Sequence, residues 1–183
     1  MPRLRPIEDH KATGTQHLLI EMARLNGPLD PVFASICVRS EVGRNWLRYV
    51  NDLFNGGILP VPLKEMVRFL ISMKYFPDYS SAVRSNVAKA YGLTDAKLKA
   101  SANFEKSDLF DEREKAALRY AELFKAGDYT IDSDDVYLDL KKYFTEEEII
   151  ELAMVCAETD GVGKFSRSLL MMPANYSRDF ANG

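Results

Sequence analysis

The sequence predicts an all-α, single-domain helical bundle, and three observations support this fold class. Apolar residues recur at three- and four-residue spacing through most of the chain. No segment alternates apolar and polar residues as a half-buried strand does, and no hairpin dipeptide lies between two such segments. Capping residues precede many of the apolar segments, and Gly or Pro follows them. We therefore expect about eight helices joined by short connections.

The N-terminal half contains four segments with a helical pattern after a polar arm, residues 1–14. We take residues 15–183 as one all-helical domain. The most apolar of the four segments is apolar on most sides, which predicts a central helix. The four are residues 15–27, which end at Gly27, 30–40, with Pro31 just inside the start, 41–57, stopped by Gly56 and Gly57, and 59–76, with Pro62 at the first helical position.

A break and a new helix are predicted directly after the central helix. Pro77 ends that helix, and Asp78 is placed to cap the next one, which we expect to close at Gly92. Thr94 is the expected cap of a short helix through the DAKLKASA stretch.

Two capping boxes mark the starts of helices in the C-terminal half. Asp111 is followed three positions later by Glu114, and Thr145 in the same way by Glu148. A further helical segment, SDDVYLDLKKYF, lies between the helices that these boxes open. Two glycines, Gly161 and Gly163, lie within the last helical segment and predict close packing or a break there.

Composition and charge exclude several classes of function. The 183 residues are 46% hydrophobic and 28% charged, as in a globular domain with a real core. The formal net charge is −3 and no lysine or arginine run occurs, so we expect no nucleic-acid partner. The MPRLRP start has no apolar stretch behind it, and the longest apolar runs are far too short for a membrane span. We expect a cytoplasmic protein with no membrane partner.

The histidines and cysteines limit the chemistry further. Both histidines, His10 and His17, lie in the first 17 residues, so the rest of the chain lacks the usual metal ligand and general base. We expect no metal and no cofactor, and no Ser-His-Asp triad unless the N-terminus folds over the body. Without an export signal, Cys37 and Cys156 are expected to be buried free thiols in apolar helices.

Four stretches together resemble one known family. In order, they are ILPVPLKEMVRFLIS, SSAVRSNVAKAYGLTDAKLKA, FDEREKAALRYAELF and YFTEEEIIELAMVCA. Over residues 28–172 the chain resembles the carboxymuconolactone decarboxylase / alkyl hydroperoxidase D-like superfamily, and its length is similar to the longer branch of about 180 residues. The resemblance implies a helical bundle of the alkyl hydroperoxidase D-like type that self-associates as a dimer, trimer or hexamer.

The redox motif of that family is not present here. Its redox members carry a glutamate, two cysteines in a C-x-x-C motif, and a histidine. On that spacing Glu65 matches the glutamate, whereas Pro77 and Ser80 stand at the cysteine positions and Arg84 at the histidine position. Thiol peroxidase chemistry needs a thiolate and a second thiol to resolve the sulfenic acid. The resemblance therefore implies the fold without the thiol chemistry.

The remaining polar residues suit acid–base chemistry on a small carboxylated or carbonyl-containing molecule. A buried glutamate can act as a general acid or base, and an arginine can hold a carboxylate. The candidate catalytic residues are Glu65, Asp78 and Tyr79, and the candidate substrate-binding residues are Arg84, Ser80, Tyr75, Asp160 and Lys164. The last two lie on a helix that lines the pocket in relatives.

Structural interpretations stand beside these roles. Asp78 can be only an N-cap, Arg84 can be an internal ion-pair partner of Glu65, and the tyrosines can be core or interface aromatics. Two function classes therefore stay open: an acid–base enzyme of lyase, hydrolase or isomerase type, and a non-catalytic small-molecule binder or structural oligomer. Polar replacements at the motif positions favour the enzyme, since an unused pocket would more readily fill with apolar residues. An alkyl hydroperoxidase is a remote third hypothesis.

Overall fold

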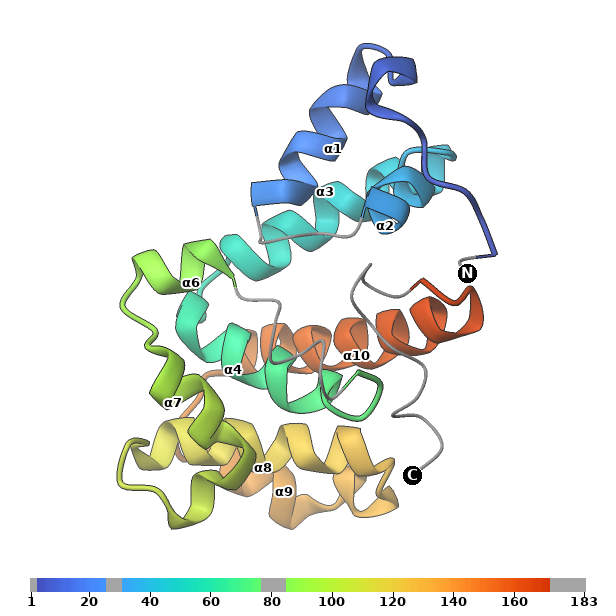
Figure 1. The fold of residues 1–183 in the computed structure, drawn as a ribbon. Helices are drawn as coiled ribbons and strands as arrows, with labels where there is room; N and C mark the ends of the chain where they lie inside the picture. Colours follow the sequence, from blue (N-terminus) through green and yellow to red (C-terminus); the bar gives the residue numbers. More distant parts are fainter. Residues whose placement is uncertain (1–2, 26–30, 77–84, 172–183) are drawn as a thin grey trace, which may run out of the picture.

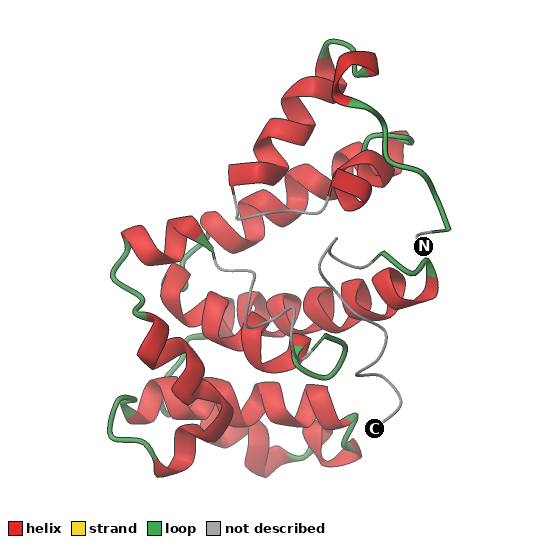
Figure 2. Ribbon diagram, in the orientation of Figure 1, coloured by secondary structure: helices red, strands yellow, loops and turns green. Residues whose placement is uncertain are grey.

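The computed structural model describes residues 3–25, 31–76 and 85–171, and within these ranges the chain forms helices and loops without strands (Figure 1, Figure 2). This confirms the all-α class. The α-helices are α1 (Thr15–Leu25), α2 (Pro31–Cys37), α3 (Glu41–Asn55), α4 (Val61–Ser72), α6 (Asn86–Ala90), α7 (Asp95–Ala100), α8 (Glu112–Ala126), α9 (Asp134–Lys141) and α10 (Glu146–Ser168). Three short 3-10 helices accompany them at Asp9–Lys11, Ser101–Lys106 and Tyr129–Asp132. None of the described helices is long and apolar enough to cross a membrane.

The predicted caps set most of the helix ends. The capping boxes of α8 and α10 are both complete, with side chain and backbone bonded in each direction. The Thr94 side chain accepts the N–H of Lys97 at the start of α7. Gly127 ends α8 in the left-handed region at φ 69°, a conformation that costs glycine little.

Helix α4 is the centre of the larger hydrophobic core, as its apolar sequence predicts. It packs most extensively against α8 and α10, and fully buried side chains such as Met66, Val67 and Leu70 fill the contact. Figure 1 shows α8 and α9 on one side of α4 and α10. Burial on nearly every side of α4 makes any charged residue on this helix informative, because an unpaired buried charge is costly.

A second, smaller core joins α1, α2 and α3 on the other side of α10 (Figure 1). Leu19, Ile20, Val38 and Leu47 are its buried centre. The N-terminal arm is attached to this part of the molecule, because the Ile7 N–H donates to Ser35 Oγ at 2.6 Å. The boundary of the arm at residue 14 stays a prediction.

Two details differ from the sequence prediction. Leu18 and Leu19 both fit the apolar periodicity of residues 15–27, but Leu18 is 65% exposed, and Leu19 and Ile20 are the buried residues. The single helix expected from Asp78 to Gly92 is wrong at Ser85, which is extended (φ −65°, ψ 116°) and caps the short helix α6. Residues 77–84, including Pro77 and Asp78, lie outside the described residues.

Candidate functional site

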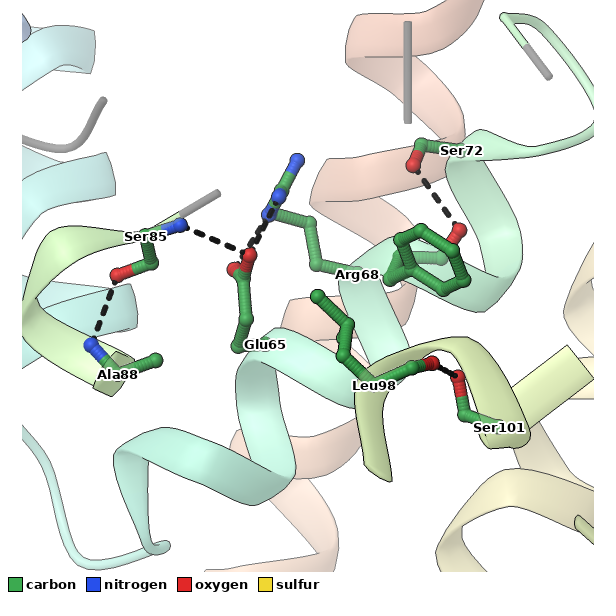
Figure 3. Close-up of polar contacts among 8 residues, drawn as sticks. Glu65, Arg68, Ser72, Ser85, Ala88, Leu98 and Ser101 are labelled. Carbon is green, nitrogen blue, oxygen red and sulfur yellow. Dashed lines mark hydrogen bonds and ion pairs between the residues drawn. The ribbon is translucent and has the colours of Figure 1, made fainter. Parts of the chain in front are cut away.

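Glu65 lies in the middle of α4 and is 4% exposed. Its carboxylate forms a two-pronged ion pair with Arg68, one turn further along the helix (Figure 3). Arg68 Nε donates to Oε2 and Arg68 Nη2 donates to Oε1, each at 2.7 Å. This planar, paired geometry is the strongest form of a carboxylate–guanidinium contact.

The same carboxylate also fixes the start of α6. The Ser85 N–H donates to Glu65 Oε1 at 3.1 Å, and Ser85 Oγ accepts the Ala88 N–H at 3.0 Å (Figure 3). Ser85 therefore caps α6 with its side chain while its backbone is tied to α4. As the N-cap residue, Ser85 has no carbonyl partner for its N–H within α6, and Glu65 supplies the acceptor.

Glu65 thus has the partner that its burial demanded, and the partner is one that sequence reasoning did not name. The spacing of Glu65 and Arg68, i and i+3, was the available signal. The structure does not test the expected contact between Glu65 and Arg84, because Arg84 lies outside the described residues. That contact stays a prediction.

Tyr75, Asp160 and Lys164 come together at a second position, just after the end of α4. The Tyr75 hydroxyl donates to Asp160 Oδ1, and Lys164 Nζ donates to Oδ2 of the same carboxylate. Lys74 Nζ lies 3.6 Å from Asp160 Oδ1. The turn after α4 is thereby fastened to α10 through a single carboxylate.

The electrostatics of this cluster follow from its contacts. Burial pushes the pKa of Asp160 up, but the hydrogen bonds from Lys164 and Tyr75 outweigh it and hold the pKa below the ordinary range. Burial, and next the bond to Asp160, raise the pKa of Tyr75. Asp160 is therefore ionised and Tyr75 neutral near neutral pH, with the phenol as the donor.

The close approach of Tyr75 to α10 depends on Gly163. A Cβ built at Gly163 would lie 2.1 Å from Tyr75 Cδ2, well inside any real contact. Arg167 Nη1 also donates to the Tyr75 backbone carbonyl at 3.4 Å. The sequence predicted close packing or a break at the two glycines, and Gly163 is a site of close packing within an unbroken helix.

These two clusters flank the segment in which the other candidates lie. Tyr75 lies just before residues 77–84, and Ser85 directly follows them. The Asp160 carboxylate on α10 therefore holds Tyr75, before the segment. The Glu65 carboxylate on α4 holds Ser85, after it. The four remaining candidates lie outside the described residues: Asp78, Tyr79, Ser80 and Arg84.

The hydrogen bonds and ion pairs of the two clusters described above involve no cysteine and no histidine. Cys37 and Cys156 are buried and free, as predicted. Burial raises the pKa of Cys37 to about 12 and raises that of Cys156 further, so neither thiol is poised as a thiolate. His10 lies 3.3 Å from Glu8 in an exposed pair, and His17 is exposed on α1.

Comparison with known proteins identifies the fold. No protein-family model and no curated protein matches the chain. Among solved structures, the apo debrominase Bmp8 superposes with a TM-score of 0.75 at 18% identity, covering 93% of this chain and 91% of Bmp8. A cysteine-to-alanine variant of Bmp8 in complex with 2,3,4-tribromopyrrole gives 0.72 at 19% identity, covering 90% and 87%.

A third structure extends the comparison to a shorter protein. It is an Agrobacterium tumefaciens protein of unknown function for which a role in antioxidant defence as AhpD has been proposed. Its TM-score is 0.60 at 14% identity, covering 74% of this chain and 92% of that one. The agreement in fold confirms, at the level of architecture, the resemblance drawn from the four sequence stretches. The chain has the alkyl hydroperoxidase D-like fold.

Proposed function

We propose that the protein is an acid–base enzyme, of lyase, hydrolase or isomerase type, that acts on a small carboxylated or carbonyl-containing molecule. The observation that carries the proposal is the buried Glu65 carboxylate, paired with Arg68 and bonded to Ser85 next to the candidate segment. A buried ion pair on a largely apolar helix is costly, so its presence beside the candidate segment supports a functional role. The debrominase of the same fold, whose variant binds tribromopyrrole, supports action on a small molecule.

The pair offers a direct link between substrate binding and proton transfer. Arg68 is 21% exposed at its side chain, so its guanidinium reaches the edge of the buried region. A substrate carboxylate that draws Arg68 away leaves the Glu65 carboxylate buried without its counter-ion. A buried carboxylate without a counter-ion favours taking up a proton, which is the action of a general base. In this proposal Arg84 and Ser80 hold the substrate, and Asp78 and Tyr79 complete the proton transfer.

Thiol peroxidase activity is not part of the proposal. Pro77 and Ser80 carry no sulfur, and the two cysteines of the chain are buried with raised pKa values. The proposal also includes self-association, which the family resemblance implies, and a cytoplasmic location.

A second candidate function is a non-catalytic binder of the same fold. The favouring observation is that the Glu65 carboxylate already accepts two hydrogen bonds from the guanidinium of Arg68 and one from the N–H of Ser85. In this second candidate, the only role of the three bonds is to hold α6 against α4. In that case the pair contributes stability and no chemistry.

A substrate panel separates the two candidates. The protein is incubated with small keto acids, lactone carboxylic acids and, separately, hydrogen peroxide, and NMR follows the loss of each compound. Glu65→Gln is run in parallel, with Glu112→Gln as the matched control because Glu112 is 60% exposed on α8. The enzyme proposal expects turnover of at least one acid by the parent and the control, and at least a hundredfold less by Glu65→Gln.

Three other outcomes would count against the enzyme proposal or a part of it. No turnover of any acid favours the binder. Equal turnover by Glu65→Gln removes Glu65 from the catalytic site. Peroxide consumption that disappears in a Cys37→Ser/Cys156→Ser variant contradicts the exclusion of thiol chemistry.

A further inference from the structure

A pocket of about 390 Å³ lies between α2, the start of α3 and the C-terminal half of α10. In Figure 1 these N-terminal helices lie above α10. Its volume is in the range of small-molecule sites. The walls are mostly apolar or small: Ile36, Cys37, Ser40, Val42, Gly43, Trp46, Ala157, Glu158, Gly161, Val162 and Phe165.

The single ionisable carboxylate in these walls is Glu158. Trp46 Nε1 donates to Glu158 Oε1 at 2.5 Å, which orients the carboxylate within the pocket. No lysine, arginine or histidine of the described residues pairs with it. Burial raises the pKa of Glu158 above the ordinary value, and the Trp46 bond opposes this in part. The carboxylate would therefore gain from a positive partner.

We propose that this pocket binds a small apolar amine, whose ammonium group pairs with Glu158 while its apolar part lies against Trp46 and Phe165. The ammonium supplies the positive charge that the pocket walls lack. The Gly43 N–H at the rim is already taken up by Ser40 Oγ at 2.9 Å, which weakens this end of α3 as a site for an anion.

The site is independent of the proposed function. It shares no lining residue with the Glu65 or Tyr75 clusters, and its ligand is a cation where the proposed substrate is an acid. Failure of one proposal therefore leaves the other standing.

The fluorescence of Trp46, which lines the pocket, can be used to measure ligand binding. Trp46 is the one tryptophan of the chain, and it touches the proposed ligand-binding carboxylate. A ligand in the pocket must change its fluorescence, which tyrosine emission does not obscure when excitation is at the red edge. The probes are phenethylamine, its neutral counterpart phenethyl alcohol and the anion hydrocinnamate, each titrated into the full-length protein.

Three variants complete the experiment. Glu158→Gln removes the charge and keeps the shape. Gly161→Leu fills the pocket, because a Cβ at Gly161 meets nothing within 4 Å and leucine favours a helix over glycine. Glu122→Gln is the control, since Glu122 is on α8 and pairs with Lys125 near the surface. Circular dichroism checks that each variant keeps its fold.

The proposal expects saturable binding of phenethylamine by the parent and Glu122→Gln, at least tenfold weaker binding by Glu158→Gln, and none by Gly161→Leu. It also expects the alcohol and the anion to bind the parent at least tenfold more weakly than the amine. Equal affinity for the amine in the parent and Glu158→Gln overturns it, as does equal or tighter binding of hydrocinnamate. Absence of any saturable change in the parent with phenethylamine overturns it as well.

Discussion

Gly163 and Gly161 are two positions apart on α10, and they have opposite surroundings. A Cβ at Gly163 would overlap the Tyr75 ring at 2.1 Å, whereas one at Gly161 meets nothing within 4 Å. We predict that Gly163→Ala destabilises the protein by about 1–3 kcal/mol through overpacking. Gly161→Ala should be neutral or stabilising by up to about 1 kcal/mol, from helix propensity. Urea unfolding of the two variants measures the difference, and equal stabilities would contradict the packing of Tyr75 on Gly163.

Asp160 predicts a pH dependence whose sign follows from its contacts. Its pKa is lower in the folded than in the unfolded chain, because Lys164 and Tyr75 stabilise the ionised form. The stability that it contributes is therefore present above its unfolded pKa and is lost as pH falls through the folded value. We expect Asp160→Asn to be less stable than the parent at neutral pH, with a gap that narrows in acid. Thermal unfolding across the acid range tests this, and a gap that widens in acid would show the sign to be wrong.

At the scale of single residues, side-chain contacts between positions close in the sequence can be predicted from spacing, whereas contacts between distant positions cannot. Glu65 and Arg68 are three positions apart on one helix, so their contact is readable from the spacing. Tyr75 and Asp160 are separated by 85 positions, and both were named as candidates without any sign that they touch each other. Trp46 and Glu158, 112 positions apart, were not named at all. Only the packing of α3 and the turn after α4 onto α10 creates these contacts.

At the scale of elements, the caps and stops were predicted well because they are local. The capping boxes at Asp111 and Thr145 and the glycine stop of α3 are readable within a few residues. The break at Ser85 is not local. The sequence around it predicts one continuous helix, whereas Ser85 is extended and its N–H donates to Glu65 on α4, 20 positions earlier in the chain.

Lys64 connects three helices through a single buried side chain. It is fully buried on α4, and its Nζ donates to the Leu53 carbonyl at 2.8 Å, to the Gly56 carbonyl, and to Glu151 Oε1 at 2.8 Å. Glu151 in turn accepts the N–H of Ile58 at 2.7 Å. One buried ion pair therefore joins the end of α3 and the following loop to α4 and α10.

We predict that Lys64→Met destabilises the protein by about 3–5 kcal/mol, because Glu151 is left as an uncompensated, largely buried charge. Lys125→Met is the matched control, since Lys125 forms a surface pair with Glu122 and its loss should cost less than about 1 kcal/mol. Urea unfolding compares the two. A similar small loss for both variants would mean that the Lys64 pair does not join these elements.

At the scale of the molecule, an apolar stripe on α10 supports self-association. Ile150 is 61% exposed, and Met154, one turn further along the helix, is 39% exposed. Exposed apolar residues gathered on one face are typical of an interaction surface. The stretches 63–76 and 149–157 each carry apolar residues on more than one side of a helix. Which side stays uncovered depends on the packing of α3 and α4 against α10.

We predict that the protein sediments as a species larger than the 20.8 kDa monomer at micromolar concentration. Ile150→Glu/Met154→Glu should shift the distribution toward the monomer, because charges on an apolar interface are costly to bury. Glu146→Lys, at the exposed start of the same helix, serves as the control for changed charge. A parent that sediments at 20.8 kDa contradicts the prediction.

The central claim is that Glu65 acts in chemistry and does not serve only to hold α4, Arg68 and α6 together. The most direct measurement is the turnover of Glu65→Gln on any acid that the parent converts, taken together with its free energy of unfolding. We predict at least a hundredfold loss of turnover, with the fold kept and a stability loss of about 1–3 kcal/mol from the broken Arg68 pair. Full turnover in a destabilised Glu65→Gln variant would contradict it and leave Glu65 a purely structural residue.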